Sequence, residues 1–151
     1  MTSPATDNRR AVVRVLGHEI LRTLSSMARL HDGDMIALLI FTGIWTINSQ
    51  HLIGETNRYA ALRDIPPDSQ RRPATLGELG RLVAIPEPIL RDYVERLIEQ
   101  GRVERTSAGL LVPSAVFTQS EMLDASNELY TDLVTMVSAL RDAGFRFGEA
   151  A

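Results

Sequence analysis

The sequence predicts a mainly α-helical fold that contains one small β-hairpin. Two T-x-x-E sequences, at 75–78 and 118–121, are typical of capping boxes, in which the Thr hydroxyl and the Glu carboxylate pair with backbone N–H groups at a helix start. Apolar residues recur at three- and four-residue spacing through 8–30, 75–83, 86–100 and 118–144, as expected of amphipathic helices. The turn Ser107-Ala108-Gly109 separates two short β-type segments, 103–106 and 110–113, and predicts the hairpin.

The N-terminal part of the chain predicts two helices. Residues 8–30 form an amphipathic pattern, with apolar positions at Val12, Val13, Leu16, Ile20, Leu24 and Met27. Asp34 is placed to cap a second helix over 35–47, which is apolar on all sides and contains Phe41 and Trp45. A membrane span needs about 20 apolar residues, and this run has only about thirteen. We therefore expect a buried central helix and no membrane partner.

The chain divides by composition into five parts. Residues 1–7 are expected to be disordered, and 8–62 to supply helices for the core and for dimerisation. Residues 54–62, with Tyr59 and Leu62, favour one or two last helical turns, and 63–73 contains DIPPDSQRRP, a typical flexible loop. Residues 74–114 carry the hairpin and the two helices before it, and 115–151 a C-terminal dimerisation helix with its tail.

The segment 75–113 predicts a winged helix-turn-helix. A helix begins at Thr75 and ends at the β-branched, proline-bearing run 83–86. Pro86 and Pro88 suit the first turn of a second helix, 86–100, and Gly101 suits its end. The hairpin 103–113 follows as the wing. Because a second helix of this motif enters the major groove, the segment favours binding of double-stranded DNA.

The same residues resemble a known family. The segment VERLIEQGRVER at 94–105 resembles the part of bacterial MarR-type regulators where the recognition helix runs into the wing. The short wing, ERTSAGLLVP at 104–113, is more similar to Crp- or IclR-type wings than to the longer, more charged wing of the MarR family. The resemblance implies a transcriptional regulator, a two-fold dimer built from terminal helices, and a cleft for a small-molecule effector. The N-terminus, MTSPATDNRR, lacks the apolar core of a signal peptide, so we expect a cytoplasmic protein.

The last predicted helix has more apolar surface than a small core can bury. Met122, Leu129, Leu133, Met136 and Leu140 form one stripe, and a second stripe runs beside it. We expect part of this surface to contact a second copy of the chain in a homodimer. The alternative is that the whole helix packs against the first two helices of its own chain.

Composition and isolated motifs exclude several chemistries. The chain has no cysteine and all 16 residues of the Lys-plus-Arg count are arginine, which excludes disulfides, thiolate sites and Walker-A or Schiff-base lysines. His18-Glu19 lacks an HExxH partner, so both residues are expected to face solvent. His31, Asp32 and Asp34 have a ligand-like composition, but helix capping explains Asp34 without metal. We expect no enzyme activity and no cofactor.

The charge distribution predicts modest non-specific affinity for DNA. The net charge is −3, and between residues 71 and 105 seven arginines stand against six acids. A strong phosphate binder would show a larger excess of positive charge. This balance leaves open a winged-helix protein-interaction module without DNA binding. A third possibility is a small-molecule-sensing regulator with a cleft lined by Trp45, Tyr59 and the last helix.

Twelve residues are the candidate DNA contacts. Arg91 is the expected base reader, because a guanidinium can pair with O6 and N7 of guanine; Arg96 could instead pair with Asp92 at i,i+4. Thr75 begins a helix whose first amides could bind phosphate. The recognition-helix candidates are Glu87, Pro88, Ile89, Arg91, Asp92 and Arg96. The candidates for contact with the DNA backbone are Arg71, Arg72, Thr75, Arg105, Thr106 and Ser107.

Overall fold

The computed structural model describes residues 7–147 and is mainly helical, with one antiparallel sheet of two strands, as the sequence predicts. Residues 1–6, which make up most of the predicted disordered N-terminus, and residues 148–151 lie outside the described part. The α-helices are α1 (Arg9–Ala28), α2 (Met35–Ser49), α3 (Leu76–Val83), α4 (Glu87–Glu99), α5 (Ser114–Phe117) and α6 (Ser120–Asp142). The strands are β1 (Glu104–Thr106) and β2 (Gly109–Leu111), and short 3-10 turns are η1 (Arg29–His31), η2 (Gln50–Leu52) and η3 (Asp68–Gln70).

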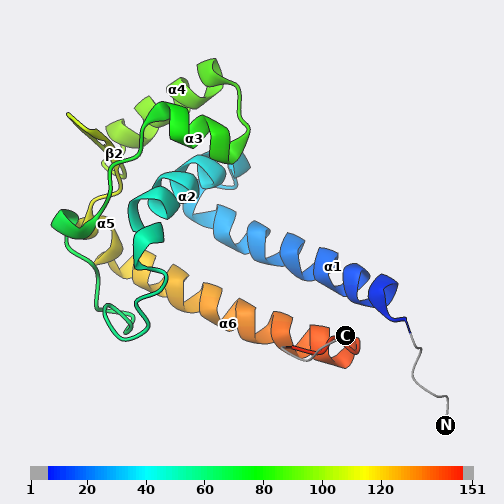
Figure 1. Cartoon of the computed structure of the whole chain (residues 1–151). Helices are drawn as coiled ribbons and strands as arrows, with labels where there is room; N and C mark the ends of the chain where they lie inside the picture. The colour runs from blue at the N-terminus through cyan, green and yellow to red at the C-terminus, as the bar shows by residue number, and fades with distance from the viewer. Residues whose placement is uncertain (1–6, 148–151) are drawn as a thin grey trace, which may run out of the picture.

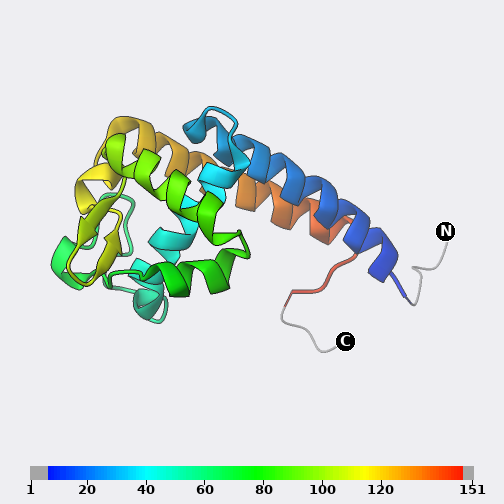
Figure 2. The same ribbon diagram turned by 90° about the horizontal axis from the view of Figure 1, so that it is seen from above.

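Helices α1 and α6 lie side by side, antiparallel, and extend from the rest of the molecule as a two-helix arm (Figures 1 and 2). Arg22 of α1 joins them, because its guanidinium contacts Glu19 at 2.8 Å and Asp132 of α6 at 2.9 Å. Both carboxylates are buried. The prediction that Glu19 faces solvent is therefore wrong, since α6 covers that side of α1; His18 is exposed as expected.

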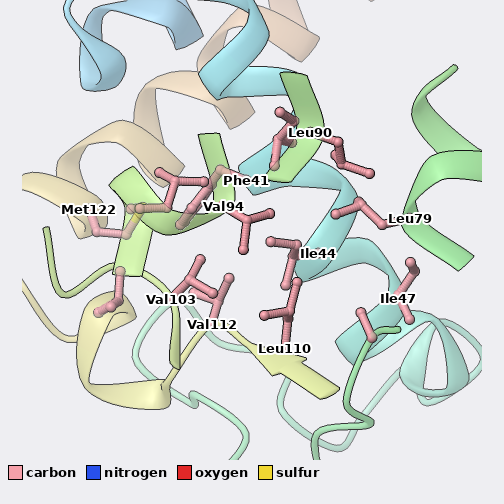
Figure 3. Close-up of a cluster of buried hydrophobic side chains, with 14 residues drawn as sticks. Phe41, Ile44, Ile47, Leu79, Leu90, Val94, Val103, Leu110, Val112 and Met122 are labelled. Carbon is pink, nitrogen blue, oxygen red and sulfur yellow. The ribbon is translucent and has the colours of Figure 1, made fainter. Parts of the chain in front are cut away.

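Helix α2 lies at the centre of the core. The Asp34 side chain accepts hydrogen bonds from the backbone N–H groups of Ile36 and Ala37, at 3.0 and 3.1 Å, so the predicted N-cap is confirmed. Ile40 and Ile44 of α2 are completely buried, among side chains from α3, α4 and the hairpin (Figure 3). The predicted central helix is thus confirmed, although Met35, Ile36 and Leu39 on its other side are partly exposed.

One stretch of the described chain, Met35–Leu52, could cross a membrane by length and composition alone. Its 18 residues have a hydropathy of 1.2, and 39% of them are buried inside the protein. The buried central helix of a soluble domain has the same length and composition. Ile40, Ile44 and Ile47 of this stretch are buried in the core.

Helices α3 and α4 begin and end at the residues that the sequence indicates. The capping box at Thr75 is confirmed, because Thr75 Oγ1 accepts from Glu78 N at 3.1 Å and Glu78 Oε1 accepts from Thr75 N at 3.2 Å. Ala84 ends α3 in the left-handed conformation with φ of +52°. Helix α4 follows after Pro86, and Gly101 takes a φ of +73° beyond its end.

The hairpin is held to the core by one buried side chain and one backbone bridge. Asn48 of α2 donates from Nδ2 to the carbonyls of Arg72 and Leu110, at 2.7 and 3.1 Å, and accepts from Val112 N at 2.9 Å. Ala74 exchanges backbone hydrogen bonds with Leu110 at 2.8 and 2.7 Å. Asn48 therefore fixes both the segment before α3 and the strand β2 relative to α2.

Two local predictions in the connecting segments are wrong. Thr118 does not cap the last helix: α5 occupies 114–117, Thr118 Oγ1 donates to the Ala115 carbonyl, and α6 begins at Ser120 after Gln119 with no side-chain cap. Residues around Tyr59 and Leu62 form turns and no helical turn; the described helix ends at η2. The predicted loop 63–73 contains the 3-10 turn η3.

Candidate nucleic-acid interface

Helix α4 has one buried and one exposed face. Leu90, Val94 and Leu97 recur at helical spacing and are buried against the core. The opposite face begins at Glu87 and Pro88, after which the exposed residues are Ile89, Arg91, Asp92, Glu95 and Arg96. The recognition-helix candidates therefore lie together on one exposed surface at the N-terminal half of α4.

The arginines of this face are paired with carboxylates. Arg91 contacts Glu87 at 2.6 Å, and Arg96 contacts Asp92 at 2.6 Å, the alternative that the i,i+4 spacing indicates. Arg105 of β1 contacts Glu95 of α4, which brings the hairpin beside the recognition-helix candidates. Exposed pairs of this kind contribute about 0–1 kcal/mol, so each guanidinium can leave its carboxylate at small cost.

Arg71 and Arg72 are adjacent in sequence but lie in different environments. The Arg71 side chain is buried, stacks over the Phe117 ring at 4.7 Å and has Asp68 at 3.9 Å. Burial lowers the pKa of Arg71, and the neighbouring Asp68 opposes that effect. Arg71 is therefore unavailable to phosphate, contrary to the prediction, whereas Arg72 is exposed and lies beside the hairpin.

Among the candidate contacts to the DNA backbone, most of the hydroxyl groups instead hydrogen-bond within the local fold. Thr106 Oγ1 donates to the Gly109 carbonyl at 2.8 Å and accepts from the backbone N–H groups of Ala108 and Gly109. Thr75 Oγ1 is engaged in the capping box of α3. Ser107 is exposed at the tip of the hairpin. Among the three hydroxyls, Ser107 is thus the one most accessible to a ligand.

Sequence reasoning missed Arg81 and Arg102. Arg81 is exposed in the last turn of α3 and has no carboxylate partner among residues 7–147, so the apolar spacing of α3 could have placed it on the surface. Arg102 follows α4, donates to the Leu30 carbonyl at 2.6 Å and lies 3.0 Å from Nδ1 of His31. Its role depends on η1, which lies 72 residues away, and no local pattern indicates that contact.

An apolar cavity of about 110 Å³ lies between α1, α2 and α6. Trp45 and Phe117 line it, with ring centroids 6.1 Å apart. The predicted cleft beside Trp45 and the last helix is therefore present, but Tyr59 is not part of its wall. Within the described residues, no three His, Asp or Glu side chains come together in a way that could hold a metal ion.

Comparisons with known proteins give no relative for this chain. No protein-family model matches it, and no curated protein or solved structure does so.

Proposed function

We propose that residues 74–113 are a winged helix-turn-helix and that the protein is a homodimeric, sequence-specific DNA-binding transcriptional regulator. In this proposal α4 enters the major groove and the hairpin 103–113 lies on the DNA backbone. The Arg105–Glu95 pair is the observation that carries it, because it joins the hairpin to the exposed face of α4. Arg91 and Ile89 would read base edges, and Arg72, Arg81 and Arg105 would contact phosphates.

The exposed apolar residues of the arm support a homodimer. Tyr130, Leu133 and Val134 are 68%, 51% and 52% exposed on α6. Val13 and Leu21 are 59% and 66% exposed on α1, eight residues apart and so on similar sides of the helix. A second arm packed on these residues would bury them and form a four-helix arrangement. The dimer would also carry two α4 helices for two half-sites.

DNA binding is tested with oligonucleotides selected from a random pool and measured by fluorescence anisotropy across a salt series. Arg91→Ala should cost about 1–3 kcal/mol on the preferred site and relax discrimination at one base pair. Arg105→Ala should weaken all duplexes alike and lower the salt slope by about one unit. Arg63→Ala, an exposed arginine in the loop before η3, is the matched control and should bind unchanged.

The ionic balance favours a second candidate function, a protein-interaction module that uses the same scaffold without DNA. With Arg71 buried, six arginines and six acids remain between residues 71 and 105, and three of those arginines are paired. Absence of salt-dependent binding to any selected duplex would refute the DNA proposal and leave this one. If both variants lose affinity equally for all duplexes, Arg91 is a phosphate contact and reads no base.

The dimer is tested by sedimentation at micromolar concentration. Leu133→Asp should give a folded monomer, because Leu133 is half exposed and its replacement leaves the core intact. Leu62→Asp is the matched control, since Leu62 is 49% exposed in a loop and lies outside the arm. Leu140 belongs to the predicted stripe but is buried within the chain, so its replacement would test folding. An unmodified protein that sediments as a monomer would overturn the proposal.

A further inference from the structure

The cavity between α1, α2 and α6 is walled by both aromatic and acidic side chains. Phe41, Trp45 and Phe117 supply aromatic surface. Asp132 and Glu128 of α6 are the acids among the described residues of the wall, and no arginine is one of them. Glu128 accepts a hydrogen bond from Ser26 and has Arg29 at 3.7 Å, so Asp132 is the acid that carries the argument. A ligand with an apolar group and a positive charge fits that combination, since cations are attracted both to carboxylates and to aromatic faces.

The buried acids beside the cavity have too few counterions. Glu19 and Asp132 are each 7% exposed, and Arg22 is the one guanidinium that pairs with both. This group of three residues therefore carries a formal charge of −1. Asp132 Oδ1 accepts from Arg22, whereas its Oδ2 is buried and accepts no hydrogen bond from any described residue. A buried carboxylate oxygen without a hydrogen-bond donor is unfavourable. A positively charged donor would satisfy Asp132 Oδ2 and neutralise the net charge of the group.

His31 also lines the cavity, and it is a neutral group. Its Nδ1 lies 3.0 Å from Nη1 of Arg102, and because arginine only donates, Nδ1 is the acceptor. Burial first, and the Arg102 charge second, lower the pKa of His31 to about 4. His31 thus adds no positive charge to the cavity. Its protonated Nε2 is buried and has no acceptor among the residues described.

We propose that this cavity is a binding site for a small organic amine: one ring or a short alkyl group against Trp45 and Phe117, with its ammonium group donating to Asp132. The volume of about 110 Å³ is below that of an engineered cavity of about 150 Å³ that accepts benzene, so one ring is the upper limit and it enters only with a small shift of the wall side chains. The acidic wall and the net charge of the Glu19–Arg22–Asp132 group disfavour a carboxylate ligand of equal size. Binding at this site does not depend on DNA recognition.

The test compares three probes of the same size and different charge. Benzylamine, benzyl alcohol and benzoate are titrated into the full-length protein without DNA. Trp45 is the one tryptophan of the chain and lines the cavity, so its fluorescence reports occupancy directly. Benzylamine should bind on the order of tenfold tighter than benzyl alcohol, as expected for a hydrogen bond to a charged group. Benzoate should bind more weakly than both.

Three variants test whether the preference for benzylamine arises at Asp132 in the cavity. Asp132→Asn should bring benzylamine and benzyl alcohol within about threefold of each other, because the charge of Asp132 is lost. Asp124→Asn is the matched control, since Asp124 is an exposed acid on the same helix and is not part of the wall. Ala125→Leu fills the cavity and keeps Asp132, so it should abolish binding of all three probes. Thermal unfolding of each variant confirms that it is folded.

Two results would overturn the proposal. One is benzoate binding as tightly as benzylamine to the unmodified protein, which would contradict the charge argument. The other is no response to benzylamine at millimolar concentration in fluorescence or ligand-observed NMR, which would leave the cavity as a packing feature. If Asp132→Asn fails to fold, Ala125→Leu still decides whether the observed binding occurs in the cavity.

Discussion

Asn48 is the side chain through which the central helix holds the hairpin, and its replacement tests that arrangement. It is completely buried and makes three hydrogen bonds to the backbone of Arg72, Leu110 and Val112. Asn48→Ala leaves one N–H and one or two carbonyls without a partner, because Leu110 keeps its bond from Ala74. At about 1 kcal/mol for each bond, the free energy of unfolding should fall by about 3 kcal/mol. Domains are stable by only about 5–15 kcal/mol, so this loss is large.

The assay is urea unfolding followed by far-UV circular dichroism at one fixed protein concentration, since a dimer would make the midpoint depend on concentration. Asn57→Ala, at an exposed loop position, is the control and should change the unfolding free energy little. Asn48→Leu restores volume but not hydrogen bonding, and should remain destabilised. If Asn48→Ala costs less than about 0.5 kcal/mol, or if Leu restores full stability, the hydrogen bonds do not hold the hairpin.

Three further predictions concern stability. Gly109→Ala should destabilise the hairpin by about 2 kcal/mol or more in the same assay, because Gly109 has a φ of +143° and an added Cβ would lie 2.6 Å from the Ala74 carbonyl oxygen; an unchanged midpoint would contradict this. Burial and Arg102 lower the pKa of His31 from 6.5 to about 4, so His31 stays neutral in the folded protein. Its contribution to the free energy of unfolding is therefore complete above pH 6.5 and is lost as the pH falls toward 4. The unfolding free energy should therefore fall by about 2 kcal/mol by about pH 5, and this pH dependence should be absent from His31→Gln. Thr75→Ala should cost about 1 kcal/mol through loss of the cap, and an unaffected midpoint would refute that role.

Local patterns predicted the helices whose signals lie within a few residues. The capping box at Thr75, the N-cap at Asp34 and the turn at Gly101 depend on side chains and backbone groups of adjacent residues. Such interactions form in the same way wherever the segment packs. The second capping motif fails at Thr118 because a separate short helix, α5, ends there and occupies the Thr118 hydroxyl.

The candidate site was predictable as a surface but not in its charges. The spacing of Leu90, Val94 and Leu97 determines which side of α4 faces the core, and hence that Arg91 is exposed. No spacing indicates that Arg105 contacts Glu95, because those residues belong to different elements.

The sequence by itself determined helices α1 to α4, the turn between α3 and α4, the hairpin and the absence of cysteine and lysine chemistry, because these depend on composition and on neighbours along the chain. Only the tertiary structure decided which of two adjacent arginines is buried: Arg71 stacks on Phe117, 46 residues away, while Arg72 is exposed. It likewise brought Glu19, Arg22 and Asp132 together across α1 and α6. The energy of a buried charge depends on partners distant in sequence, and local periodicity does not specify those partners.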